Sequence, residues 1–81
     1  MTENQIIELG FEKEFHADNE DLYYYTYDVA LGLCLITQMN DEVKDGNWYV
    51  EFFDTTPSIR FTEPEDLKQL LEILKSKVHY E

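Results

Sequence analysis

Hydrophobic side chains recur at helical spacing near the end of the chain, in residues 62–78. The positions that share one side are Leu67, Leu70, Leu71, Leu74 and Val78. Thr62 is the expected N-cap, Pro64 lies in the first turn, and Glu65 follows the cap by three residues, as helix starts favour. Lysines occupy the other side and the C-terminal end, where they complement the helix dipole. The pattern predicts an amphipathic helix.

A shorter helical pattern, TENQIIELGF, lies near the start of the sequence. Thr2 and Gln5 have the spacing of a capping box, in which each side chain accepts a bond from the other residue's backbone. Gly10 suits the left-handed position that ends many helices. Phe11 is then expected to fold back on the last turn. The sequence therefore predicts a short N-terminal helix.

Between the two helices the hydrophobic positions alternate, as they do along β-strands. Strands are expected at residues 11–15, 22–29, 33–38, 48–54 and 58–61. The polar segment 16–21 is expected to be a loop, and the pair Asp45 and Gly46 marks a turn. The prediction is one α+β domain over residues 1–81. It is an antiparallel β-meander of four to five strands, with an N-terminal short helix and a C-terminal helix packed on one face.

The stretch DLYYYTYDV carries aromatic rings on both sides of one strand, so its register decides which tyrosines reach the core. A three-residue loop over residues 30–32 places Val29 opposite Leu33 and uses Gly32 near its end. A two-residue loop would exchange the pairing and stays open as an alternative. In the first register the core face contains Tyr25, Tyr27, Val29, Leu33 and Leu35. The opposite face contains Tyr24, Thr26, Asp28, Cys34 and Ile36.

The last two expected strands extend both faces. The side chains expected to point inward are Trp48, Val50, Phe52, Ile59 and Phe61, whereas Tyr49, Glu51 and Phe53 are expected outside. The uncovered outer side is then an amphipathic mixture of the kind found at protein interfaces. Its expected interface residues are Tyr24, Ile36, Tyr49, Phe53 and Arg60. We expect a homodimer through this side of the sheet.

Eighteen acidic residues against six basic ones give a formal net charge of −12. Such a surface repels nucleic acid and anionic membranes, and no apolar run approaches the ~20 residues of a membrane helix. The single cysteine, Cys34, excludes an internal disulfide, and the polar start MTENQ lacks the regions of a signal peptide. We expect a cytoplasmic protein that binds neither nucleic acid nor a membrane directly.

The sequence contains no pattern of a nucleophile beside a base, which covalent catalysis requires. Cys34 lies in the middle of an expected strand, whereas the histidines lie in a loop at His16 and near the end at His79. Cys34 is expected to be a small hydrophobic side chain. The glycines stand alone at turns, not in a phosphate-binding loop. The expectation is a protein that is not an enzyme and holds no cofactor.

A small metal-binding protein is an alternative, because carboxylates two or three residues apart in a loop can converge on a divalent ion. The residues concerned are His16, Asp18, Glu20 and Asp21. Most loops of this composition are solvated turns. The segment before Gly46 has a faint calcium-loop pattern, but Val43 stands at a ligand position and Phe52 at the closing one. A shift of the thermal melt with metals or chelator would identify a metal site.

A family resemblance is carried by the segments YYYTYDVALGLCLI, NWYVEFFD, SIRF and EDLKQLLEILK. From about Leu9 onward, the chain resembles a group of small proteins of unknown function found in bacteroidete genomes and their phages. The group brings no known activity or site residues. The resemblance implies a phage or mobile-element origin, where small acidic inhibitors of host defence are common.

Charge and resemblance together favour a non-catalytic interaction module, such as a small acidic inhibitor or adaptor that binds a basic protein surface. The candidate partner-binding acids are Asp41, Glu42 and Asp45, and other carboxylates that could stand in for phosphates are Asp18, Glu20, Asp21 and Asp54. Acidity that only keeps an aromatic-rich domain soluble is one alternative. A self-associating structural domain is another.

Overall fold

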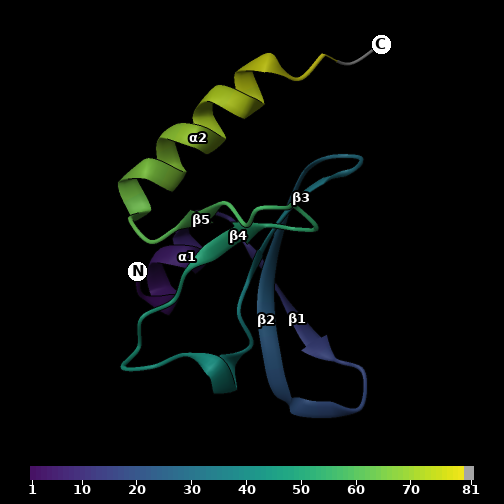
Figure 1. Cartoon of the computed structure of the whole chain (residues 1–81), viewed down its shortest axis with the longest axis vertical. Coiled ribbons are helices and arrows are strands. Elements are labelled where there is room, and N and C mark those ends of the chain that lie inside the picture. Colours follow the sequence, from purple (N-terminus) through teal and green to yellow (C-terminus); the bar gives the residue numbers. More distant parts are fainter. Residues whose placement is uncertain (80–81) are drawn as a thin grey trace.

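Five antiparallel strands form one sheet whose spatial order, β1-β2-β3-β4-β5, follows the chain (Figure 1). The strands are β1 (Glu12–His16), β2 (Asn19–Ala30), β3 (Leu33–Thr37), β4 (Val50–Phe52) and β5 (Arg60–Phe61). A short helix, α1 (Glu3–Glu8), precedes the sheet, and a longer one, α2 (Pro64–Lys77), follows it. The computed structural model, which describes residues 1–79, confirms the predicted α+β meander.

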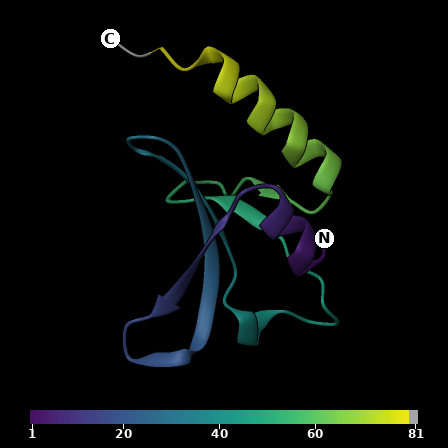
Figure 2. The same cartoon turned by 180° about the vertical axis from the view of Figure 1, so that it is seen from behind.

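One hydrophobic core joins both helices to the inner face of the sheet. Ile6 of α1 and Leu67 of α2 are fully buried in the same cluster as Leu35 of β3. The other buried members of the cluster are Phe11, Tyr25, Trp48, Val50 and Leu71. In both views α1 lies beside the start of α2 (Figures 1 and 2). Both helices therefore contribute to the core on one face, as the hydrophobic pattern predicts.

The predicted capping box closes the start of α1. The amide of Gln5 donates to Thr2 Oγ1 at 3.2 Å, and the amide of Thr2 donates to Gln5 Oε1 at 2.8 Å. Gly10 has φ 99°, the left-handed conformation that the sequence predicts there. Phe11 then turns back and is buried. Thus four local signals in the first eleven residues position α1 against the core.

The start of α2 corrects one prediction, because Glu63 and not Thr62 is the N-cap. Proline disfavours helical backbone angles in the residue before it, and Glu63 is extended with φ −102° and ψ 125°. Pro64 is the first helical residue, where its missing N–H costs nothing. Glu63 makes no side-chain capping bond. The helix therefore begins one residue later than a Thr62 cap would place it.

The β2–β3 hairpin has a two-residue turn, Leu31 and Gly32, not the predicted three-residue loop. Ala30 pairs with Leu33, so the predicted pairing of Val29 with Leu33 is wrong. A bulge between Asp28 and Ala30 inserts Val29 as an extra residue. Beyond this bulge the register is the predicted one, with the pairs Thr26–Ile36, Tyr27–Leu35 and Asp28–Cys34. The bulge thus compensates for the shorter turn, and Tyr25, Tyr27, Val29 and Leu35 belong to the core as predicted. Leu33 departs from its prediction, because it lines the hollow beside the turn and is not among the described residues that form the core.

Strand β2 begins at Asn19, three residues earlier than predicted, so the expected loop over residues 16–21 shrinks to a tight turn at Ala17 and Asp18. Local bonds explain the difference. The amide of Asp18 donates to His16 Nδ1 at 3.2 Å, and the amide of Asp21 donates to Asn19 Oδ1 at 2.9 Å. These polar side chains satisfy backbone groups within the hairpin, so the polar composition does not prevent strand pairing.

The segment before β4 is held by bonds from outside the sheet, so β4 is shorter than predicted. The amide of Trp48 donates to Met1 O at 2.7 Å, and the Met1 amino group donates to Trp48 O at 2.9 Å.

Trp48 and Val50 are buried and Phe52 packs on the core, as predicted. Ile59 departs from its prediction because it precedes β5 and is 47% exposed. Phe61, within β5, does pack against the core.

Candidate interaction surfaces

The sheet face opposite the helices carries a row of paired residues that crosses all five strands. The row consists of Glu12, Thr26, Ile36, Glu51 and Arg60. Tyr24 pairs with Glu14 on the same side, two residues before Thr26 along β2. We call this side the outer face. Its apolar centre, formed by Tyr24 and Ile36, lies between carboxylates on β1 and the Glu51–Arg60 pair on β4 and β5.

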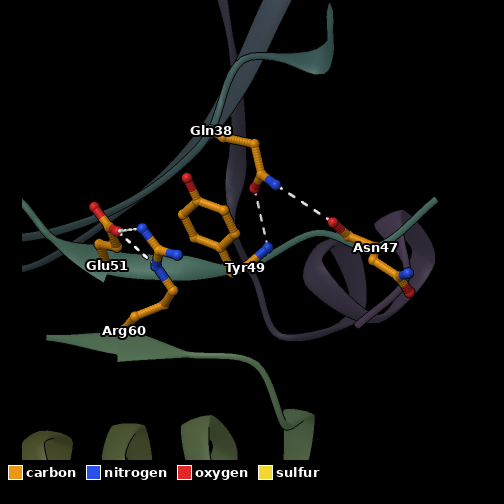
Figure 3. A network of polar contacts seen from close by, with 5 residues as sticks. All are labelled: Gln38, Asn47, Tyr49, Glu51 and Arg60. Atoms are coloured by element: carbon orange, nitrogen blue, oxygen red, sulfur yellow. Dashed lines mark hydrogen bonds and ion pairs between the residues drawn. The ribbon is translucent and has the colours of Figure 1, made fainter. Parts of the chain in front are cut away.

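A polar network holds the β4 and β5 end of the outer face (Figure 3). Arg60 Nη2 lies 2.7 Å from Glu51 Oε1, and Arg60 Nε donates to the same oxygen at 2.8 Å. The guanidinium carbon of Arg60 lies 3.9 Å from the centre of the Tyr49 ring, a cation–π distance. The Glu51 carboxylate raises the pKa of Arg60. The structure therefore brings together two of the predicted interface residues, Tyr49 and Arg60.

Gln38 extends this network beyond the end of β3 (Figure 3). Its Oε1 accepts a 2.9 Å bond from the Tyr49 amide, and its Nε2 donates to Asn47 O at 3.3 Å. Main-chain pairing between β3 and β4 ends at Thr37 and Val50. The Gln38 side chain thus replaces the next step of the ladder and positions Tyr49 beside Arg60.

The other predicted interface residues are not part of this network. Tyr24 and Ile36 are half-buried in the middle strands of the outer face. Phe53 follows β4, where its amide donates to Cys34 O at 2.9 Å, and its side chain is 61% exposed. The predicted group is therefore spread over the whole outer face, with Phe53 at the end near the β2–β3 turn.

The tyrosines of β2 divide between the two faces as the alternation predicts. Tyr25 is buried, and its hydroxyl donates a 2.5 Å bond to Glu3 Oε2 on α1. Tyr23 stacks on Trp48 with ring centres 6.3 Å apart, and Tyr27 contacts Phe11 at 5.3 Å. Burial, followed by the Glu3 carboxylate, raises the pKa of both Tyr23 and Tyr25. Three tyrosines therefore build the core side, and Tyr24 alone faces outward.

Within residues 1–79, three basic side chains lie over aromatic rings of the same chain. Lys13 Nζ is 3.9 Å from the Tyr23 ring centre, and Lys75 Nζ is 5.2 Å from that of Tyr27. Arg60, described above, is the third. Aromatic rings covered by a cation of the same chain are not free to stack on nucleic-acid bases. Sheets that bind single-stranded nucleic acid also need a cationic groove. Three of the six basic residues of the chain thus make cation–π contacts with its own aromatic rings.

The three candidate acids lie on the long connection between β3 and β4. Asp41 and Glu42 belong to a short 3₁₀ helix, η1 (Asn40–Glu42), and are exposed. Asp45 and Gly46 have φ 55° and 71° in the turn closed by the Lys44–Asn47 bridge, as expected for a tight turn between paired residues. The structure therefore places all three carboxylates on one exposed connection, which lies toward the lower end in Figure 1.

The candidate metal loop is not gathered around a common point. Within residues 1–79, no three His, Cys, Asp or Glu side chains are arranged so that they could hold a metal ion. His16 Nδ1 instead accepts the bond from the Asp18 amide, as described for the β1–β2 turn. Cys34 is half-buried, and burial together with the neighbouring Asp28 carboxylate raises the pKa of its thiol. Its half-burial agrees with the small hydrophobic side chain that the sequence predicts.

Sequence reasoning missed a hollow beside the β2–β3 turn, with a volume of about 590 Å³. Its lining includes Leu31, Leu33, Cys34 and Phe53, with the carboxylates Asp28 and Asp54. Leu31 is fully exposed at the turn. We call this feature the turn hollow. The apolar Leu31 in a turn was the one sign of this hollow in the sequence. Phe53, which lines the hollow with Leu31, is distant in sequence.

Comparison of the chain with protein-family models, curated proteins and solved structures finds no match. In the part of the chain that the structure describes, no helix is long and apolar enough to cross a membrane.

Proposed function

We propose that this chain is a non-catalytic interaction module, a small acidic inhibitor or adaptor that binds a basic surface of a protein partner. The observation that carries the proposal is the charge of −12 on 81 residues. Such an excess accelerates encounter with basic surfaces and repels nucleic acid. The resemblance to small proteins of bacteroidete genomes and phages adds a phage or mobile-element origin to the proposal.

The arrangement of the ionic groups supports this function. Over residues 1–79, Arg60–Glu51 is the one ion pair within 4.0 Å. The ammonium groups of Lys13 and Lys75 lie over rings. Most carboxylates of the described residues therefore have no cation of the chain within ion-pair distance. Their field extends into solvent, where it is available to a cationic partner.

Asp41, Glu42 and Asp45 are the proposed partner-binding acids because they are exposed on one connection. The test uses a protein captured from host lysate on the immobilised chain, identified, and purified. Its affinity is then measured as ionic strength rises from about 0.01 M to about 0.15 M, which shortens the Debye length from about 30 Å to about 8 Å. We expect a steep loss of affinity. Binding that is indifferent to salt would refute the proposal.

Two variants that remove the same number of charges test where on the chain the basic partner binds. Asp41→Asn, Glu42→Gln and Asp45→Asn together remove three negative charges from the connection, and asparagine tolerates the left-handed backbone at position 45. The control, Glu8→Gln, Glu14→Gln and Glu72→Gln, removes three charges from exposed positions elsewhere. The first variant should slow association more than the control. If both triple variants slow association equally, the contact depends on net charge, and the assignment of the partner-binding site to the β3–β4 connection is wrong.

Self-association is a second candidate, favoured by the uncovered outer face. Tyr24 and Ile36 form an apolar centre there, and Tyr49 and Arg60 lie at its side. The mixture of aromatic and arginine side chains is typical of protein interfaces. A homodimer through this face is therefore proposed as an alternative use of the same module.

A further inference from the structure

We propose that the turn hollow is the docking site for an apolar side chain of a protein partner that is flanked by lysine or arginine. This inference rests on the proposed function and assigns its contact to residues other than the acidic connection. The proposed occupant is a leucine-like anchor within a basic segment.

The first support is an exposed leucine that the fold does not need. Gly32, the second residue of the two-residue turn, has φ 86°, a left-handed conformation that glycine adopts without steric cost. Leu31, its neighbour in the turn, is fully exposed. A polar side chain at this position would serve the turn equally well. The apolar residue is therefore free to contribute to a contact outside the chain.

The second support is that residues from two distant segments meet at this point. Phe53, immediately after β4, lies beside the hairpin because its amide bonds Cys34 O at 2.9 Å. Asp54 has φ 61°, so the chain turns away directly after Phe53. Leu31, Leu33 and Phe53 line the hollow together. Its volume of about 590 Å³ lies within the range of roughly 300–1,000 Å³ that is typical of small-molecule binding sites.

Charge decides which occupant fits. Asp28 and Asp54 line the turn hollow, and within the described residues its lining contains no basic side chain. A second copy would bring another charge of −12 and the same two carboxylates to this place, and like charges at contact distance disfavour association. A basic segment gains attraction from the same two groups. An apolar anchor beside a cation therefore fits where a second copy does not.

The turn hollow and the acidic connection are separate places. Both views show the β2–β3 turn in the upper part of the molecule and η1 in the lower part, along the longest axis (Figures 1 and 2). Contacts at the two surfaces can therefore be observed independently. Variants at one surface should leave the other unchanged.

The experiment follows backbone amide signals of the ¹⁵N-labelled full chain during titration with three short peptides. The first has one leucine between pairs of lysines, the second has serine in place of leucine, and the third has the leucine between pairs of glutamates. We expect the first peptide to shift the amides of Leu31, Leu33, Cys34 and Phe53. It should bind roughly tenfold more tightly than the serine peptide, equivalent to about 1.4 kcal/mol, and the glutamate peptide should not bind.

Two variants test the site itself. Leu31→Ser and Phe53→Ser should each abolish the advantage of the leucine peptide over the serine peptide. Ile73→Ser is the control, because Ile73 on α2 is 58% exposed and does not line the hollow. It should leave that advantage unchanged. Leu31 is fully exposed, so its replacement should not unfold the protein.

Several results would overturn the inference. Equal binding of the leucine and serine peptides, or shifts confined to Asp41, Glu42 and Asp45, would show basic binding without an apolar anchor. The docking site would then be wrong, without any consequence for the proposed function. Absence of shifts with the leucine peptide would also refute the docking site. The salt dependence measured with the captured partner judges the proposed function separately.

Discussion

The hydroxyl of Tyr25 donates a 2.5 Å hydrogen bond to Glu3 Oε2 and so joins the middle of β2 to α1. Tyr25 is 2% exposed, whereas the neighbouring Tyr24 points to the opposite face. One strand thus uses adjacent tyrosines for different purposes. The inner ring fills the core and fixes a helix, and the outer ring lies half-buried on the outer face.

Tyr25→Phe should lower the free energy of unfolding by about 1–2 kcal/mol, because a partly buried carboxylate loses its donor while the ring still fills the core. Urea unfolding measures the change. The control is Tyr24→Phe on the outer face, which should change stability less. Equal losses in the two variants would show that the bond to Glu3 contributes little to the attachment of α1.

Alkaline pH should destabilise the protein through the same pair. Burial and Glu3 raise the folded-state pKa of Tyr25 above its ordinary value of 10.0, so the fold favours the neutral phenol. Its contribution to stability is complete below pH 10.0 and is lost as pH rises toward the folded-state pKa. Urea midpoints at neutral pH and above about pH 10 measure this loss.

Glu3→Gln is the matched variant for the alkaline effect. The amide retains an acceptor for the Tyr25 hydroxyl but removes the negative charge that raises the pKa of Tyr23 and Tyr25. The loss of stability above pH 10.0 should therefore be smaller than in the parent protein. An unchanged pH dependence would assign the effect to burial alone.

Gln38→Ala should release the segment before β4. The variant removes an acceptor for the Tyr49 amide and a donor to Asn47 O, which together contribute about 1–2 kcal/mol. Hydrogen exchange of the Tyr49 amide should become faster, whereas that of Leu35 in the core should change only with global stability. Gln38→Glu keeps the acceptor alone and should give an intermediate result. Unchanged exchange at Tyr49 in the alanine variant would contradict the role assigned to Gln38.

The architecture was predictable because its signals are local and repeated. Leu67 and Leu71 recur along α2, Thr2 and Gln5 mark the start of α1, and alternation along β2 assigns its tyrosines to faces. Each signal depends on residues a few positions apart. The fold class and most of the core followed from them.

The features that the sequence did not reveal depend on distant partners. The bulge at Val29 is visible only once β2 and β3 are paired, since it offsets a turn that is one residue shorter than expected. Gln38 binds Asn47 and Tyr49 across the β3–β4 connection. The turn hollow likewise needs Phe53 beside Leu31. Composition indicates an acidic surface, but it cannot indicate where an apolar hollow opens within it.

Tyr24→Asp should dissociate a homodimer formed through the outer face while the secondary structure stays intact, since the side chain lies on the side away from the core. Light scattering at high micromolar concentration measures the oligomeric state, and circular dichroism checks the fold. Salt supplies a second readout. Two copies repel each other with a charge of −12 each, so dimerisation should strengthen as ionic strength rises, whereas binding to a basic partner should weaken. A strict monomer at every ionic strength would refute the homodimer and leave the outer face to a different protein.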